Sequence, residues 1–265
     1  MSAAPDGFVE VGGRRIEVAR VGVADPGAPC MVFLHEGLGS VAAWRDFPRR
    51  LCERLGLRGL LYSRPGYGRS TPRAAGERWG TDFMDRQATE VLPAVLEACG
   101  VDAGRAPPWL FGHSDGGSIA LIHAARFPDR VAGVVALAPH LFVEDLSVRS
   151  IREAREDYLH GGLRERLARF HDDVDSAFFG WNDAWLDPAF ERWSIEPLMP
   201  AVRGPVLAVQ GRDDRYGTMA QIEAIARAVP GTRLLALEGC GHSPHRDRPD
   251  EVVGAVGRLL ADTIH

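Results

Sequence analysis

Cysteine is scarce and scattered in this chain of 265 residues. The four cysteines, Cys30, Cys52, Cys99 and Cys240, lie far apart in the sequence and form no CxxC pair. Disulfide-dense scaffolds and zinc sites built on paired cysteines are therefore excluded, and we expect reduced, mostly buried thiols. HExxH and GxGxxG motifs are also absent, so the sequence predicts neither a metal nor an organic cofactor.

A basic leader and long apolar runs are missing as well. The opening residues MSAAPDGFVEVGG hold no basic stretch followed by an apolar run, and no segment approaches the roughly 18 apolar residues of a membrane helix. We therefore expect a cytoplasmic protein with no membrane partner. The 31 basic residues are interspersed among 36 acidic ones, and the resulting net charge of -5 without a basic stripe excludes nucleic acid as a partner. Self-association into a homo-oligomer stays open, because exposed apolar faces cannot be located from sequence.

The chain does contain short runs rich in β-branched and aromatic residues that alternate with longer segments of helical periodicity. An opening pair of antiparallel strands is predicted at FVEVG and RRIEVARVG, and further strands at CMVFLH, GLLYS, PWLFGH, VAGVVALAP, PVLAVQG and TRLLALEG. Helices are predicted near 41–55, 82–99, 115–127, 217–229 and 249–262, with Gly or Pro at their ends. This order is typical of an α/β fold, in which helices cover both faces of a mostly parallel central sheet.

One stretch interrupts the alternation. Residues 143–200 are helical and charged at first and then dense in aromatic residues, with no buried strand. We interpret this stretch as a helical cap, inserted into a core formed by residues 1–142 and 201–265. Because it connects two strands of the sheet, we expect it to emerge at the carboxyl edge, where open α/β folds bind ligands.

The segment PWLFGHSDGGSIALIHAARFP is typical of a strand, a tight turn and a helix, and its centre fits the pattern G-x-S-x-G. Gly112 and Gly116 flank Ser114, because a side chain at either flank would collide with the neighbouring strand or helix. Ser114 would then lie at the start of a helix, whose dipole and free N–H groups favour an oxyanion. A surface serine in a glycine-rich turn is the alternative, but the apolar strand and helix on either side favour a nucleophile.

The tight turn around Ser114 resembles the nucleophile elbow of the α/β-hydrolase superfamily. The likeness covers nearly the whole chain apart from the cap. The family's order of serine, acid and histidine implies a catalytic triad of Ser114, Asp214 and His242. Asp214 ends the turn GRDD, similar to the family's G-x-x-D turn; neighbouring Asp213 is interpreted as a helix cap, and the two exchange roles if the register is off by one. His242 stands in the G-H loop before the final helix, and His245 is interpreted as a solvated side chain.

The first central strand ends in LHEGLGS, similar to the family's H-G-x-x-G loop. This resemblance implies that the backbone N–H groups of Gly37 and Asp115 form the oxyanion hole. The sequence departs from the family pattern at Glu36, where glycine is expected, and at Asp115, where a hydrophobic residue is more usual. Two carboxylates would oppose an oxyanion unless paired or pointed away. Backbone groups or Arg64 are the expected partners, and recognition of a hydroxyl or cationic group of the substrate is the alternative.

The cap concentrates aromatic residues, namely Phe178, Phe179, Trp181, Trp185, Phe190 and Trp193. Packing of the cap onto the core is the ordinary role of any one of them. As a group above a hydrolase cleft, they predict an apolar acyl or aryl pocket with a few polar anchors. The candidates for this substrate pocket are Glu36, His140, Trp181 and Trp185, with Asn182 and Asp183 as further possible anchors.

These residues predict a serine hydrolase that cleaves a small carboxylic ester or thioester through an acyl-enzyme, with no cofactor and a small molecule as its only implied partner. Family members similar to this chain also hydrolyse carbon–carbon bonds or eliminate pyruvate with the same triad, and the motifs do not separate these reactions. A non-catalytic small-molecule receptor is the third interpretation, since function belongs to the site rather than to the fold.

Overall fold

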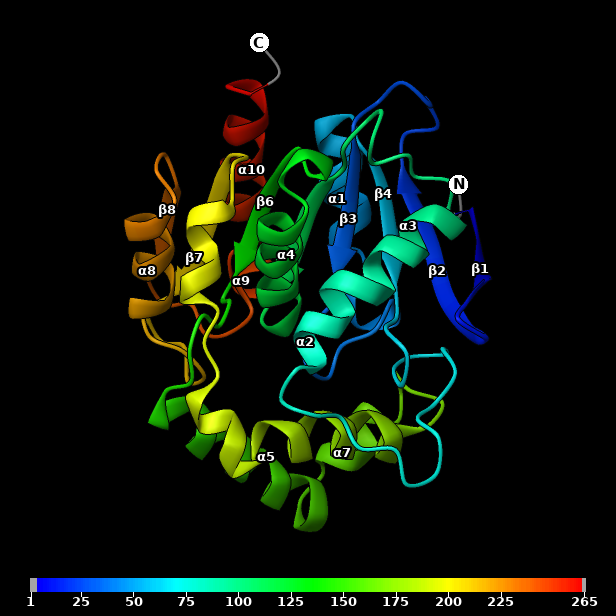
Figure 1. Ribbon diagram of the computed structural model, residues 1–265, viewed down its shortest axis with the longest axis vertical. Coiled ribbons are helices and arrows are strands. Elements are labelled where there is room, and N and C mark those ends of the chain that lie inside the picture. Colours follow the sequence, from blue (N-terminus) through cyan, green and yellow to red (C-terminus); the bar gives the residue numbers. More distant parts are fainter. Residues whose placement is uncertain (1–3, 264–265) are drawn as a thin grey trace.

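The computed structural model describes residues 4–263 and, within them, one eight-stranded sheet (Figure 1). The strands lie in the order β1-β2-β4-β3-β5-β6-β7-β8. Their bounds are β1 Ala4–Val11, β2 Arg14–Gly22, β3 Cys30–Leu34, β4 Arg58–Tyr62, β5 Trp109–His113, β6 Gly133–Leu137, β7 Val206–Gly211 and β8 Arg233–Leu237. The β1–β2 and β2–β4 pairs are antiparallel, and every other pair is parallel. The prediction of a mostly parallel sheet with an opening antiparallel pair is therefore confirmed.

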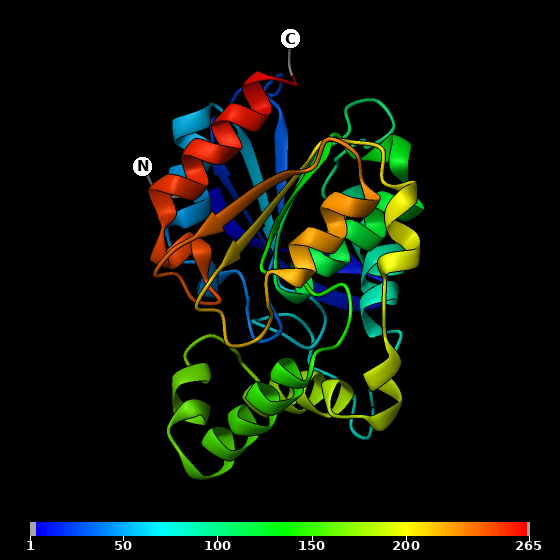
Figure 2. The same cartoon turned by 90° about the vertical axis from the view of Figure 1, so that its left-hand side faces the viewer.

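Helices cover both faces of this sheet (Figure 2). Successive residues of β3 point to opposite faces, so Val32 and Leu34 pack in one apolar cluster, and Met31 and Phe33 in another. The first cluster is completed by α2 Phe83–Arg86, α3 Leu92–Ala98, α4 Asp115–Arg126 and α8 Ala220–Ala228, and the second by α1 Phe47–Leu55 and α10 Pro249–Ala261. Burial on both faces explains why the central strands are apolar throughout rather than alternating.

Three of the predicted helices differ in detail from those observed. The helix expected near 41–55 is broken into η1 Ala42–Trp44 and α1, because Arg45 adopts a positive φ of 56°, and α1 then begins at Phe47 with Pro48 in its first turn. A π-helical segment, η2 Gln87–Val91, lies between α2 and α3, and α8 begins three residues later than expected. The short helix α9 Pro244–Asp247, just after the His242 loop, was not predicted.

The segment predicted as a cap forms a separate layer below the sheet (Figures 1 and 2). It contains α5 Asp145–His160, α6 Leu163–Leu167, α7 Val174–Trp185 and η4 Pro188–Arg192, and η5 Glu196–Ala201 leads back to the core. An isolated bridge between Phe142 and Ser194 ties the two ends of the segment together. Within residues 4–263, no helix combines the length and the apolar character needed to cross a membrane.

Candidate active site

Ser114 lies in a strained turn between β5 and α4. Its backbone angles, φ 53° and ψ -122°, are rare for a residue with a side chain. A Cβ atom added at Gly116 would lie 2.0 Å from the Leu34 carbonyl oxygen, and one at Gly112 would lie 2.1 Å from the Gly116 carbonyl oxygen. Only glycine fits at both flanks, so the first turn of α4 can pass close to β3 at Gly116.

The structure brings Ser114, His242 and Asp214 together from three distant parts of the chain. The Oγ atom of Ser114 lies 2.9 Å from Nε2 of His242, and Nδ1 of His242 lies 2.8 Å from Oδ2 of Asp214. Because the carboxylate can only accept, the proton of the neutral imidazole lies on Nδ1, and Nε2 is free to accept the serine proton. This is the geometry that an activated serine nucleophile requires.

The Asp214 carboxylate is held by groups on both sides. Gln210 donates from Nε2 to Oδ2 at 2.7 Å, and the backbone N–H of Tyr216 donates to Oδ1 at 2.7 Å. Burial opposes the charge of Asp214, but His242 and the Tyr216 N–H lower the pKa of this carboxyl below its usual value. Gln210 was missed by sequence reasoning, although a glutamine inside the apolar strand VLAVQG is a signal for a buried polar partner.

Asp213 does not contact His242. Its side chain is exposed, and α8 begins only at Ala220, so the predicted helix-capping role of Asp213 is wrong. The turn therefore presents Asp214 to the histidine and Asp213 to solvent.

The His242 loop is fixed by two further histidines. His113, beside Ser114 in the elbow, donates from Nε2 to the His242 carbonyl oxygen at 2.6 Å, and burial lowers the pKa of His113 to about 4. His245 is buried against Trp44, with ring centroids 4.9 Å apart. The interpretation of His245 as a solvated side chain is therefore wrong, because α9 turns it into the core.

Gly37 and Asp115, the residues predicted to form the oxyanion hole, both line the space above Ser114. Asp115 is the first residue of α4, so its N–H has no acceptor one turn earlier within the helix. Trp181 of α7 covers Gly37, where an added Cβ atom would lie 2.1 Å from the indole Nε1. Glycine at this position lets the cap approach the loop after β3 closely.

Neither carboxylate beside the site pairs with Arg64. Glu36 accepts from the Leu38 N–H at 3.2 Å, and Asp115 accepts from Nε1 of Trp185 at 3.1 Å. Arg64 is buried, and it donates to the backbone oxygen of Glu36 at 2.9 Å rather than to its side chain. The expected backbone partner is therefore present for Glu36, whereas the expected ion pairs to Arg64 are not.

A cavity of about 200 Å³ lies above Ser114. All four predicted pocket residues line it, namely Glu36, His140, Trp181 and Trp185, and they are joined by Leu38, His113, Ile151, Tyr216 and Ser243, which sequence reasoning did not select. Asn182 is instead buried against Arg155 and the Ile151 carbonyl, and Asp183 is exposed and paired with Arg155. These two predicted anchors do not reach the cavity, because they project from other faces of α7.

The remaining cap aromatics pack against one another or against the core. Phe178 stacks on Tyr158 with ring centroids 3.7 Å apart, and Phe190 stacks on Trp193 at 5.2 Å. Trp185 both packs within the cap and reaches the site. Its ring contacts Phe190, and its N–H donates to Asp115. Of the six cap aromatics, the two tryptophans of α7, Trp181 and Trp185, line the cavity above Ser114.

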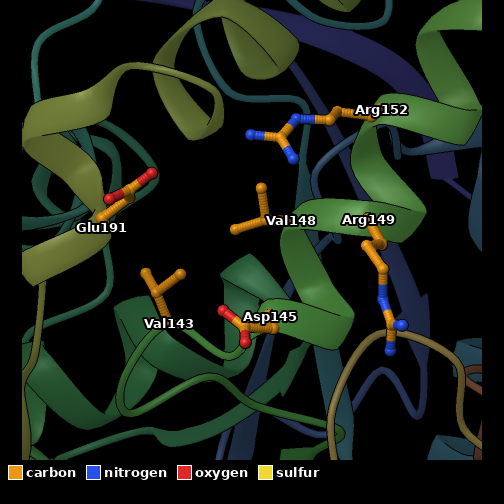
Figure 3. A pocket seen from close by; sticks show the side chains of 6 residues that line it. All are labelled: Val143, Asp145, Val148, Arg149, Arg152 and Glu191. Carbon is orange, nitrogen blue, oxygen red and sulfur yellow. The ribbon is translucent and has the colours of Figure 1, made fainter.

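A second, larger cavity of about 490 Å³ lies on the cap between α5 and η4 (Figure 3). Its lining consists of Val143, Asp145, Val148, Arg149, Arg152 and Glu191. Figure 3 shows Arg152 and Glu191 extending from opposite sides toward its centre. It shares no lining residue with the cavity above Ser114, so it lies apart from that serine.

Within the part of the chain that the structure describes, no cluster of three or more His, Cys, Asp or Glu side chains is arranged to hold a metal ion. All four cysteines are free, and burial raises the pKa of the Cys240 thiol to about 11. The two other histidines that line the cavity above Ser114, His113 and His140, are buried, and burial lowers the pKa of His140 to about 3. His242 is thus the imidazole best placed to exchange a proton with the serine.

Comparisons with known proteins agree with this fold. Residues 31–255 match the alpha/beta hydrolase family. The chain is 28% identical over 278 residues to the polyketide synthase ThaQ of Burkholderia thailandensis, covering 96% of this chain but only 12% of that protein. It is 22% identical over 284 residues to the 2-hydroxy-6-oxo-6-phenylhexa-2,4-dienoate hydrolase of Burkholderia cepacia, covering 96% and 94% of the two chains.

The fold is also shared with solved structures. The enol-lactonase from Burkholderia xenovorans superposes with a TM-score of 0.74 at 20% identity, over 96% of this chain and 99% of that chain. At this identity the likeness shows the fold alone. The family match covers both strands and helices on either side of the cap, including Ser114, Asp214 and His242. The chain therefore belongs to the alpha/beta hydrolase family.

Proposed function

We propose that this protein is a serine hydrolase that cleaves a small carboxylic ester or thioester through an acyl-enzyme. The observation that carries the proposal is the continuous chain of contacts from Ser114 Oγ through His242 to Asp214, at 2.9 and 2.8 Å. It lies at the floor of a cavity whose walls include the indoles of Trp181 and Trp185. A mostly apolar acyl or aryl group fits such walls.

In the proposed reaction, Ser114 Oγ attacks the acyl carbon while His242 Nε2 accepts the serine proton. The carbonyl oxygen becomes an oxyanion, which the N–H groups of Gly37 and Asp115 stabilise. When the bond to the leaving group breaks, His242 returns the proton to the leaving oxygen or sulfur. Water then attacks the acyl-enzyme with His242 again as base, and this step releases the acid and regenerates Ser114.

Hydrolysis of a carbon–carbon bond is a second candidate, and the similarity to the dienoate hydrolase of Burkholderia cepacia favours it. Elimination of pyruvate by the same triad, a lyase reaction, is a variant of this second candidate. Both reactions keep Ser114 and His242 in their roles but change the bond that breaks. The cavity above Ser114 is lined by two carboxylates and by no arginine, so it offers no ion-pair partner to an anionic substrate. This lining favours the ester or thioester reaction.

A panel of p-nitrophenyl esters, acyl-CoA thioesters and vinylogous diketones tests the choice of bond. Within this panel, whose acyl groups carry no amine, we expect the largest kcat/KM for an ester or thioester with a short acyl group, and a larger value for a diketone would transfer the proposal to the carbon–carbon reaction. The sequence contains no lysine, so nonspecific acylation of side-chain amines does not blur the ester assays. A fluorophosphonate should label Ser114 in the folded protein, and absence of labelling would favour a non-catalytic receptor instead.

We expect kcat/KM to rise as the pH increases through the pKa of His242, which should lie above the ordinary histidine value of about 6.5. Burial lowers the pKa of His242, but Asp214, Glu36 and Asp115 outweigh it and raise the pKa overall. His242 must be neutral to accept a proton, so activity is lost as pH falls below this pKa. The measurement is kcat/KM for one ester from pH 5 to 9.

Asp115 serves as the control for this profile. Burial raises the pKa of its carboxyl to about 6, close to the pH range in which activity is expected to rise, called here the acidic limb. In Asp115→Asn the limb should persist and move to lower pH, since a negative neighbour of His242 has been removed. A limb that disappears in Asp115→Asn would assign the titration to Asp115 rather than to the proposed base.

A further inference from the structure

The cavity above Ser114 carries negative charge with no cation on its walls. Glu36 and Asp115 both line it, and none of the lining residues is an arginine. Burial opposes the charge of Glu36, but nearby His113, Arg246 and the Leu38 N–H together lower the pKa of this carboxyl, so Glu36 is ionised at neutral pH. Burial raises the pKa of Asp115 to about 6, which still leaves most of this group ionised at pH 7.

Only one of the two Asp115 carboxylate oxygens accepts a hydrogen bond. Its Oδ1 atom accepts from Trp185, but its Oδ2 atom is buried without a hydrogen-bond partner, and the residue is 1% exposed. Arg64 lies near enough for its charge to favour the Asp115 carboxylate, but its Nη2 donates to the Glu36 backbone, and among the described residues no ion pair within 4.0 Å joins it to either carboxylate. An unpaired carboxylate oxygen in a buried wall is costly unless a ligand completes it.

The other walls are suited to a cation. Trp181, Trp185 and Tyr216 line the cavity, and aromatic faces attract ammonium groups while they exclude water. His140, between Trp185 and His242, stays neutral at pH 7 because burial lowers its pKa to about 3, and it therefore adds no competing positive charge. Two carboxylates within an aromatic enclosure form a small site for a positively charged group.

The position of this site relates it to the reaction. Asp115 directly follows Ser114, and Glu36 directly precedes Gly37, so each carboxylate is next in sequence to a residue that contacts the reacting carbonyl in the proposed mechanism. A carboxylate there opposes the developing oxyanion. A positive charge on the acyl group would lie between the carboxylates and the oxyanion. It would attract both and so offset the repulsion between them.

We propose that the protein selects acyl substrates that carry a protonated amine close to the scissile carbonyl, with Glu36 and Asp115 as the residues that recognise the ammonium group. This inference rests on the proposed serine hydrolase function and specifies the substrate class of the same site. The cavity volume of about 200 Å³ limits the acyl part to a small aminoacyl group. Glu36 and Asp115 are specificity residues here, whereas Ser114, His242 and Asp214 carry out the bond cleavage.

Three benzyl esters with acyl groups of similar shape and different charge test the proposal. They are the benzyl ester of β-alanine, which ends in an ammonium group, benzyl butanoate, which ends in a methyl group, and monobenzyl succinate, which ends in a carboxylate. Release of benzyl alcohol gives kcat/KM, and each value is divided by the rate constant for hydroxide hydrolysis of the same ester. We expect the ammonium ester to exceed the neutral ester by at least about tenfold, and the carboxylate ester to be the poorest.

Glu36→Gln and Asp115→Asn each remove one charge with little change in shape, and each should lower the ratio of ammonium to neutral ester by about tenfold. Glu191→Gln removes a carboxylate from the cavity between α5 and η4 and should leave this ratio unchanged. Because the readout is a ratio within one protein, a partial loss of folded material in either variant cancels. A wild-type ratio of one or less, or ratios that neither variant changes, would overturn the proposal.

A second readout does not need turnover. Benzylammonium should protect Ser114 from a fluorophosphonate at a concentration at least about tenfold below that of benzyl alcohol, and Glu36→Gln should remove the difference. Equal protection by the two compounds would contradict the ammonium site while labelling itself still supports the serine hydrolase. Loss of all labelling and all ester cleavage would instead contradict the proposed function.

Discussion

Replacing Ser114 with alanine is expected to lower kcat/KM for the best ester substrate by at least about 10⁴-fold, because removal of a triad nucleophile leaves only binding and oxyanion stabilisation. The Ser114 hydroxyl is the only group at the elbow that lies within 2.9 Å of His242 Nε2 among the described contacts. Labelling by a fluorophosphonate, followed by intact mass, should disappear in the same variant.

The fold should tolerate this change. Alanine and serine have similar difficulty with a φ of 53°, and the hydroxyl makes no hydrogen bond to the described chain other than that to His242. Thermal unfolding of Ser114→Ala should therefore stay close to that of the wild type. Ser194→Ala removes an exposed serine of the cap and should retain full activity and labelling. Ester cleavage that survives in Ser114→Ala would show that another group performs the reaction.

The sequence predicted a residue's place in the fold where the residues next to it in the chain determine that place. The elbow is one example, since Gly112 and Gly116 meet β3 and α4 through contacts that follow directly from a strand-turn-helix order. The strands were likewise predictable, because both faces of a parallel sheet are buried and each strand becomes a short apolar run. The order in which β4 lies between β2 and β3 was not predicted, because pairing depends on contacts between distant segments.

The residues that support the site were harder to find for the same reason. His113 holds the His242 loop across 129 positions of sequence, and the Trp185–Asp115 contact spans 70. A histidine in the elbow or an aspartate after the nucleophile does not by itself indicate its partner. Asn182 and Trp185 stand three positions apart on α7, yet one points toward Arg155 and the other toward the cavity, so the rotation of the helix had to be known.

Changing Asp214 to asparagine should lower kcat by about 10³- to 10⁴-fold while His242 and Ser114 stay in place. The carboxylate accepts from three donors, His242 Nδ1, Gln210 Nε2 and the Tyr216 N–H. An asparagine amide has one acceptor oxygen and one NH₂ group, so it cannot accept all three. If its oxygen keeps the Tyr216 N–H, its NH₂ group faces His242 and favours the tautomer with the proton on Nε2.

That tautomer cannot accept the proton of Ser114, so the nucleophile is no longer activated even though the three side chains still touch. The expected loss therefore appears in kcat, whereas fluorophosphonate labelling becomes slow rather than absent. Asp213→Asn is the matched control: its side chain is exposed and one position away, and kcat should change less than about twofold, as for an ordinary surface substitution. A large loss in Asp213→Asn together with a mild one in Asp214→Asn would assign the acid to Asp213, against the 2.8 Å contact between Asp214 and His242.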